Sequence, residues 1–326
     1  MKTILTLFLI ASLVLSPALA AGAAGEPALQ VVATNFPAFD FTRAVAGGRA
    51  QVVMLLPPGA EAHSFEPTPR DLIQAQQADL FVYNGGVGEY WAGELLASLG
   101  PGAPPSLRMM DAVQAVEEEL ADGMEDAPHA HGEHGEEDDA NGGHGDESEA
   151  RDLDEHVWTA PQNALLIAQA IARELIRLDP AGRAEYEANL ERYRGELLEL
   201  DQAFRQLVDG AARRVIVLGD RFPMRYFTMA YGLSYYAAFP GCSAQTEPSA
   251  KTIAFLVDKI KSDAVPVVFY IEASSQRSAR TIAGETGAKP LLLHSAHTVT
   301  QAELDAGATY LSLMRGNLLT LREALY

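Results

Sequence analysis

Short apolar runs alternate with longer segments of helical periodicity along most of this chain. The runs are rich in Val, Ile and Leu and contain few polar positions, as expected of strands that helices cover on both faces. Six runs are expected to form strands, at residues 30–34, 51–56, 79–83, 215–218, 265–271 and 290–293. Helices are expected between the early strands, at 70–77 and 89–99. The pattern predicts an α/β fold with mainly parallel sheets.

The longest periodic segment lies in the middle of the chain. Apolar residues recur every three or four positions between Tyr186 and Leu207, which predicts a helix of about 27 residues and ~40 Å. A helix starting at Pro161 is expected before it, ending at Leu178. Because the long helix separates two strand-rich halves, it is expected to join two lobes; the alternative is an ordinary packed helix of one domain. The expected boundaries are 26–180 for the first lobe, 181–209 for the connecting helix and 210–326 for the second lobe.

The N-terminus has the features of a secretory signal peptide, expected over residues 1–20. Lys2 is followed by an apolar stretch and by Ala18-Leu19-Ala20, a small-residue cleavage pattern that places the cut near Ala20. The apolar stretch is short for a membrane span, although an uncleaved anchor is the alternative. No cysteine follows the signal, which argues against a lipid anchor. The mature chain is expected to be soluble and periplasmic.

The composition narrows the functional classes. The 326 residues suit two compact domains, and the net charge of -20 is concentrated between Glu117 and Glu155. No basic stripe is present, so nucleic-acid binding is not expected. Cys242 is the single cysteine, which excludes an intramolecular disulfide and is expected to be buried.

Histidine is the residue type that points most directly to chemistry, because its neutral imidazole is the commonest metal ligand. Four of the eight histidines fall in an acidic, Gly-rich stretch at 125–149, PHAHGEHGEEDDANGGHGDESE; they are His129, His131, His134 and His144. Its composition predicts a loop, acting either as a weak accessory metal binder or as solvated low-complexity sequence.

The other four histidines lie in sequence that is expected to fold. His63 comes shortly after a predicted strand and a Pro-Gly turn, where α/β sheets bind ligands. Glu61 is close enough to coordinate a metal or to accept the second imidazole proton. The alternative is a loop histidine without a partner.

The remaining candidates lie later in the chain. His156 precedes a helix start, and Trp158 is expected to pack against its ring. His294 follows a predicted strand directly, with His297 as a second ligand or partner. Ser295 and the residues after it could instead make this segment a satisfied turn.

Several motifs together resemble the zinc- and manganese-specific substrate-binding proteins of ABC transporters. They are PPGAEAHSFEPTPRDL, DEHVWTAPQNALLIAQAI, DPAGRAEYEANLERY and the YGL near Tyr231. The resemblance covers essentially the whole mature chain. It implies two lobes, each a parallel sheet with helices, joined by one long helix, with a metal between the lobes and a membrane permease as partner.

The resemblance also implies a ligand set. It places the first ligand at His63 and the second at His156, but Arg221 stands at the third position, where a permanently protonated guanidinium cannot coordinate. His294 takes the place of the family's fourth ligand. The candidates for completing the shell are Asp220, Glu247, His297, Glu61 or a water, with Cys242 as a soft ligand and Glu272 as a further contact.

Three imidazoles and one oxygen suit tetrahedral zinc, whereas manganese prefers more oxygen ligands. The expected function is therefore a monomeric, extracytoplasmic zinc receptor that delivers its ion to an ABC-type permease. A manganese receptor of the same family is one alternative. A zinc-dependent periplasmic enzyme is the other, against which the chain has neither HExxH nor GxSxG.

Deleting residues 125–149 should leave one tight zinc site, because a Gly-rich loop must lose conformational entropy before it can hold a metal. Competition titration against a zinc chelator, counting ions per chain with and without the loop, checks this. Loss of the tight site on deletion would place it in the loop.

Overall fold

The structure, a computed structural model, describes residues 29–124, 153–241 and 248–326. The expected signal peptide, the four loop histidines (His129, His131, His134 and His144), Cys242 and Glu247 lie outside these residues.

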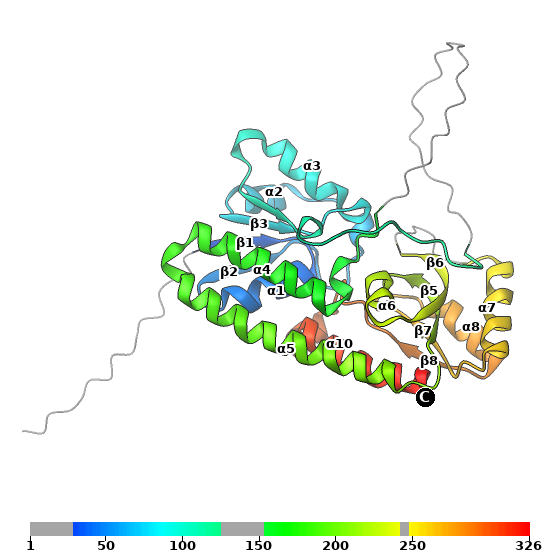
Figure 1. The fold of residues 1–326 in the computed structure, drawn as a ribbon. Helices are drawn as coiled ribbons and strands as arrows, with labels where there is room; N and C mark the ends of the chain where they lie inside the picture. The colour runs from blue at the N-terminus through cyan, green and yellow to red at the C-terminus, as the bar shows by residue number, and fades with distance from the viewer. Residues whose placement is uncertain (1–28, 125–152, 242–247) are drawn as a thin grey trace, which may run out of the picture.

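Two four-stranded parallel sheets form the centres of two lobes (Figure 1). The first lobe has the strand order β2-β1-β3-β4, and the second lobe repeats this arrangement as β6-β5-β7-β8. The strands are β1 (Leu29–Ala33), β2 (Ala50–Met54), β3 (Leu80–Tyr83), β4 (Ser106–Arg108), β5 (Val215–Phe222), β6 (Ser234–Pro240), β7 (Val267–Tyr270) and β8 (Lys289–Leu292). The predicted α/β fold with parallel sheets is confirmed.

Helices cover both faces of each sheet. The helices are α1 (Phe36–Ala46), α2 (Pro69–Gln76), α3 (Tyr90–Leu99), α4 (Pro161–Leu178), α5 (Arg183–Asp209), α6 (Arg225–Tyr231), α7 (Ala250–Ser262), α8 (Arg277–Thr286), α9 (Gln301–Asp305) and α10 (Tyr310–Leu325). In β1, Val31 joins the large core shared by the two lobes, whereas Val32 packs with residues of α2 and α3. In β5, Ile216 joins the shared core and Val217 packs with residues of α7 and α8. Successive side chains point to opposite faces of a strand, so strands buried on both faces need apolar residues at consecutive positions.

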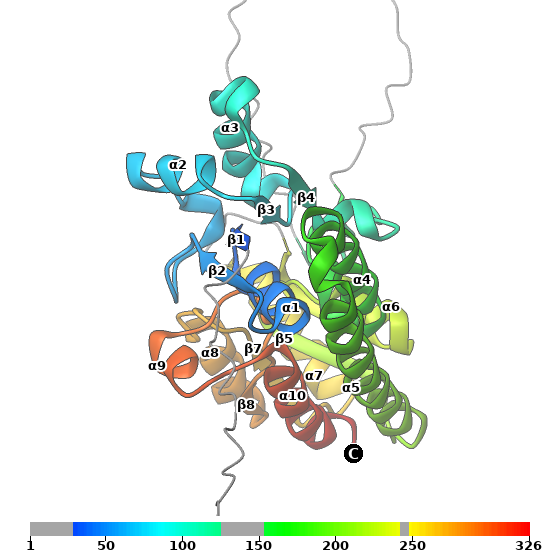
Figure 2. The same ribbon diagram turned by 90° about the vertical axis from the view of Figure 1, so that its left-hand side faces the viewer.

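The 27-residue helix α5 joins the two lobes, as expected. It packs against α1 and α4 on the side of the first lobe and against α6 and α10 on the side of the second (Figures 1 and 2). Its buried face, which includes Tyr186, Leu197 and Phe204, belongs to the shared core. Within the described ranges no helix combines the length and apolarity that a membrane crossing needs.

Two strands were not predicted from the sequence. β4 has only three residues, and β6 reads SYYAAFP, in which alanine and tyrosine replace the Val/Ile/Leu signal. β5 also runs beyond its predicted end at Leu218, across a register shift, to Phe222. This extension carries Arg221 to the C-terminal end of the second sheet.

The segments on either side of residues 125–152, which lead to His156, make hydrogen bonds with the second lobe. After β4, the backbone N–H of Val116 donates to the hydroxyl of Tyr226 in the second lobe (3.1 Å). The chain is described again from Leu153, which pairs with Glu117, and the same Tyr226 hydroxyl donates to the carbonyl of Asp154 (2.7 Å). His156 therefore lies between this contact with Tyr226 and the start of α4.

Asp40 on α1 ties the first lobe to the N-terminus of α10. The residue is only 5% exposed, and its carboxylate accepts a hydrogen bond from the backbone N–H of Tyr310 (2.8 Å). Burial raises the pKa of Asp40 from its ordinary value of 3.8 to about 6, against the opposing hydrogen bond. The folded state therefore binds this proton more tightly than the unfolded chain does.

Replacing Asp40 with Asn should increase stability at neutral pH relative to the unmodified protein, but not at pH 4. Because the folded pKa of the acid is raised, its contribution to stability falls as the pH rises from about 4 to 6, and Asn removes this dependence. The free energy of unfolding of Asp40→Asn minus that of the unmodified protein should rise by about 1–3 kcal/mol between pH 4 and 7.

Urea unfolding of the metal-free proteins measures this difference, with Asp111→Asn, at a side chain 70% exposed, as the control. A difference that does not change with pH would contradict the prediction.

Candidate metal centre

The C-terminal ends of the two sheets meet around a small cavity of about 30 Å³. Its lining residues are Ala60, Glu61, His63, His156, Arg221, Pro223, Gly241, Ile271, Glu272, Ala273, Ser295, His297 and Thr298. The carboxyl ends of strands are where open parallel sheets bind ligands. A cavity of this size has room for a water molecule or an ion, but not for an organic substrate.

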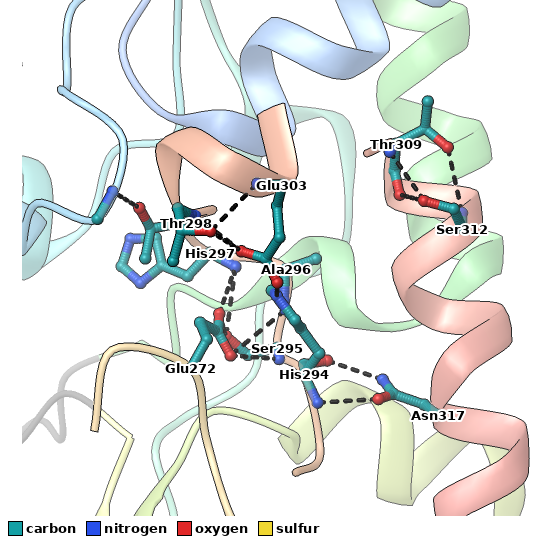
Figure 3. Close-up of polar contacts among 12 residues, drawn as sticks. Glu272, His294, Ser295, Ala296, His297, Thr298, Glu303, Thr309, Ser312 and Asn317 are labelled. Atoms are coloured by element: carbon teal, nitrogen blue, oxygen red, sulfur yellow. Dashed lines mark hydrogen bonds and ion pairs between the residues drawn. The ribbon is translucent and has the colours of Figure 1, made fainter. Parts of the chain in front are cut away.

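His63 belongs to a short 3-10 turn, Ala62–Ser64, that follows β2. The indole N–H of Trp91 donates to the carbonyl of Ala62 (3.2 Å) and holds this turn against α3. Just before the turn, the backbone N–H of Gly59 donates to Oγ1 of Thr298 in the second lobe (3.1 Å), a contact drawn in Figure 3. The turn is thereby fixed to both lobes.

Each ring nitrogen of His63 faces a carboxylate. Nδ1 lies 2.9 Å from Oε1 of Glu61, and Nε2 lies 3.3 Å from Oε1 of Glu155. Burial alone would lower the pKa of His63, but hydrogen bonds to Glu155 and Glu61 outweigh it and raise the pKa to about 9. The site can therefore hold positive charge on His63 at neutral pH.

Glu61 also forms an ion pair with an arginine of the other lobe. Nη2 of Arg221, near the end of β5, lies 2.7 Å from Oε2 of Glu61. The hydrogen bond from His63, followed by that from Arg221, holds the pKa of Glu61 well below its usual range. Arg221 thus lines the cavity without a lone pair to offer a metal, and it binds a carboxylate that could coordinate one.

His156 is 2% exposed and is oriented by Asp154. Oδ1 of Asp154 accepts from the backbone N–H of His156 (2.8 Å) and lies 3.1 Å from its Nδ1. Burial would lower the pKa of His156, but the charge and hydrogen bond of Asp154 raise it. Trp158 packs on the ring as predicted, with the ring centroids 5.5 Å apart. Gly241 approaches from the second lobe so closely that an added Cβ would lie 3.1 Å from Cε1 of His156.

His297 stands between the other two imidazoles of the cavity. Its ring centroid is 6.4 Å from that of His63 and 5.9 Å from that of His156. Burial, and then the positive charge of His156, lower the pKa of His297, which favours the neutral form that binds metals. Glu272 holds the turn by accepting from the backbone N–H groups of His297 (2.9 Å) and Ser295 (2.8 Å; Figure 3).

His294 does not line the cavity. Its Nδ1 accepts from the backbone N–H of Ala296 (2.9 Å), and its backbone exchanges two hydrogen bonds with the side chain of Asn317 (Figure 3). Its Nε2 lies 3.9 Å from Oε1 of Glu303. Asp220 is likewise outside the lining, and its Oδ1 accepts from the backbone N–H of Arg221.

The structure therefore brings together His63, His156, His297 and Glu61, four of the residues considered from the sequence. Glu155 was not among those candidates. Its only sequence signal is a carboxylate placed directly before His156 in DEH.

The three rings around the cavity lie somewhat farther apart than ligands of one ion would. Among the residues that the structure describes, no three His, Cys, Asp or Glu side chains are grouped so that they hold an ion. Two imidazoles on one tetrahedral zinc, with Zn–N distances of about 2.0–2.1 Å, have ring centroids about 5 Å apart. The separations of 5.9 and 6.4 Å are somewhat wider. An approach of about 1 Å would bring these donors into the range of one ion.

Comparison with known proteins agrees with this arrangement. Residues 31–324 match the family model described as "Zinc-uptake complex component A periplasmic", ZnuA. The high-affinity zinc uptake system protein ZnuA of Bacillus subtilis is 30% identical over 303 residues, which cover 91% of this chain and 88% of that protein. The zinc-binding protein AdcA of Streptococcus pyogenes is 30% identical over 91% of this chain, which spans only 56% of AdcA.

A solved structure shows the same fold. The Zn(II)-bound ZnuA-like domain of Streptococcus pneumoniae AdcA superposes with a TM-score of 0.72 at 26% identity, covering 91% of this chain and 98% of that domain. Since the family model spans nearly the whole described chain, the family assignment does not depend on one motif. The chain belongs to the ZnuA family, the periplasmic component A of zinc-uptake complexes.

Proposed function

We propose that this protein is an extracytoplasmic receptor that binds one zinc ion between its lobes and delivers it to an ABC-type permease. The observation that carries the proposal is the meeting of three histidines and Glu61 around a cavity with room for one ion. The names of the relatives support it, since they describe zinc uptake, zinc binding and a Zn(II)-bound domain.

The proposed ligands are His63, His156, His297 and Glu61. Three nitrogens and one oxygen make a closed tetrahedral shell for zinc, whereas manganese would need more oxygen ligands than this set offers. His294 then has a structural role beside the shell, because its Nδ1 already accepts the backbone N–H of Ala296.

Because the proposed ligands come from both lobes, binding of the ion would bring the two lobes closer together. Glu61 and His63 belong to the first lobe and His297 to the second, so an ion that draws the rings together also draws the lobes together. Helix α5 packs against both lobes along its length, which favours a small tilt over a wide hinge motion. The approach of about 1 Å that zinc needs is compatible with such a tilt.

The size of the cavity also bears on whether the protein is an enzyme. A space of about 30 Å³ holds an ion but leaves no room for an organic substrate beside it, so we propose a receptor without catalytic activity.

The protein would act as a monomer in the periplasm, after cleavage near Ala20, with no role for nucleic acid. The histidines at 125–149 would act as a weak accessory collector of metal.

Exchanging His297 for Asn should weaken zinc binding by about 100-fold or more, because a ligand is lost. The same exchange at His294 is the matched control. An Asn side chain there can still accept from Ala296 N–H, so zinc affinity should stay near that of the unmodified protein. Competition titration against a chelator measures both affinities, with far-UV circular dichroism to check the fold. If His294→Asn were the variant that loses affinity, the ligand assignment would have to move to His294.

Exchanging Arg221 for Met should tighten zinc binding about tenfold, because a positive charge beside the ion is removed and Glu61 is released from its ion pair. Arg221→Lys keeps the charge and should bind zinc much as the unmodified protein does. The same competition titration reads out both variants. Weaker binding by Arg221→Met would show that the guanidinium is needed to orient Glu61.

A further inference from the structure

We infer that Trp158 is a positioning residue for the zinc site: its ring packs against His156 and His297, and its indole N–H holds the turn that presents His297 to the cavity. The inference rests on the proposed function, in which these two histidines are ligands, and adds a residue that acts through them. Three features support it: the ring contacts of Trp158, the hydrogen bond of its indole, and the conformation of the turn that this bond holds.

Trp158 packs against two of the proposed ligands at once. It is fully buried in the 3-10 turn Val157–Thr159, directly after His156. Its ring centroid lies 5.5 Å from that of His156 and 5.2 Å from that of His297. The two imidazole centroids are 5.9 Å apart. The indole is therefore in contact with a ligand from the segment that leads into α4 and with a ligand from the second lobe.

The position of Trp158 is itself fixed. Its backbone carbonyl accepts a hydrogen bond from the hydroxyl of Tyr310, at the start of α10 (2.8 Å). The backbone N–H and the hydroxyl of Thr159 both donate to the carbonyl of His156 (3.2 and 2.9 Å). The indole also belongs to the large core shared by the two lobes. Because close-packed side chains resist displacement, an indole held in this way can hold its neighbours in turn.

The indole N–H binds the turn that carries His297. It donates to the backbone carbonyl of Ser295 (2.8 Å). An indole has this one polar group, a donor, and a buried tryptophan usually directs it to an acceptor. Ser295 is 1% exposed, and among the described residues no other group donates to its carbonyl. Removing the N–H would leave a buried carbonyl without its partner, which favours a shift of the turn.

Two further side chains hold the other polar groups of this turn. Asn317 of α10 bonds both the backbone N–H and the carbonyl of His294. Glu272 accepts from the backbone N–H groups of Ser295 and His297 (Figure 3). The backbone of the turn is therefore fixed from three sides, and only the indole reaches it from the segment that leads into α4.

The turn has a strained residue at its centre. Ala296 has a φ of 60°, a left-handed conformation that is unfavourable for a residue with a Cβ and persists where the surrounding contacts enforce it. This residue lies between His294, which does not line the cavity, and His297, which does. The contacts that hold this backbone therefore decide which imidazole the ion meets, and the bond from Trp158 is one of them.

The second tryptophan of the chain, Trp91, offers a matched comparison. Its indole N–H also donates to a carbonyl beside proposed ligands, that of Ala62 (3.2 Å), but its ring packs on Phe65. Exchange for Phe at either position removes an indole N–H and keeps an aromatic ring. Only the exchange at Trp158 should act through His297.

The test is a double-mutant cycle on zinc affinity, measured by competition titration against a chelator. Trp158→Phe should weaken zinc binding about 10- to 100-fold, as expected when a residue that orients a ligand is lost. In a protein that already carries His297→Asn, the same exchange should change the affinity by less than ~threefold, because the ligand through which Trp158 acts is gone. Trp91→Phe should have one and the same effect with and without His297→Asn.

Two results would overturn the inference. One is an unchanged zinc affinity in Trp158→Phe; the other is an equal loss with and without His297→Asn, which would mark a general effect on the fold. If Trp158→Phe fails to fold, tryptophan is replaced by 3-benzothienylalanine throughout the Trp91→Phe protein. This alters residue 158 alone and exchanges its N–H for sulfur at nearly the same shape, and the same dependence on His297 is expected.

The titrations separate this inference from the proposed function. If the unmodified protein shows no tight zinc site, the receptor function itself fails. If it binds one zinc tightly and loses affinity on His297→Asn but not on Trp158→Phe, the function stands and the role of Trp158 is wrong.

Discussion

Carboxylates hold the imidazoles of the candidate metal centre, and most of these contacts are buried. Asp154 orients His156, Glu272 holds the turn that carries His297, and His63 lies between Glu61 and Glu155. In a low-dielectric interior a hydrogen-bonded charge is stabilised, while one without a partner is expensive. The ring positions in the cavity therefore depend on acidic groups that do not all face the ion.

The candidate metal centre also depends on a framework that keeps its two halves opposite each other. One apolar core runs from the first sheet through α4, α5 and α10 to the second sheet. Asp40 adds a buried polar link between α1 and α10. Because close-packed cores resist continuous deformation, the lobes can tilt but are not expected to separate widely. A small closure would then be enough for the proposed site to surround an ion.

Arg221 gives this site an unusual charge balance. It stands where the resemblance to zinc- and manganese-binding receptors implies a ligand, yet its guanidinium binds Glu61 across the lobe interface. The loss of a possible ligand is accompanied by the placement of His297 in the cavity, between the rings of His63 and His156. Three imidazoles therefore line the cavity, although Arg221 occupies one of the ligand positions that the resemblance implies.

The sequence alone determined the α/β class, the length of α5 and the position of His63 after a strand, because these depend on local periodicity and on the ends of apolar runs. It did not reveal β4 or β6, which are too short or too poor in Val, Ile and Leu to stand out. Only the tertiary structure decided that His297 and not His294 lines the cavity, since the two are three residues apart in a turn where Ala296 has a φ of 60°. It also decided the contacts of Glu61 with Arg221, 160 residues away, and of Glu155 with His63. Such contacts depend on how distant strand ends meet, which no local pattern of residues encodes.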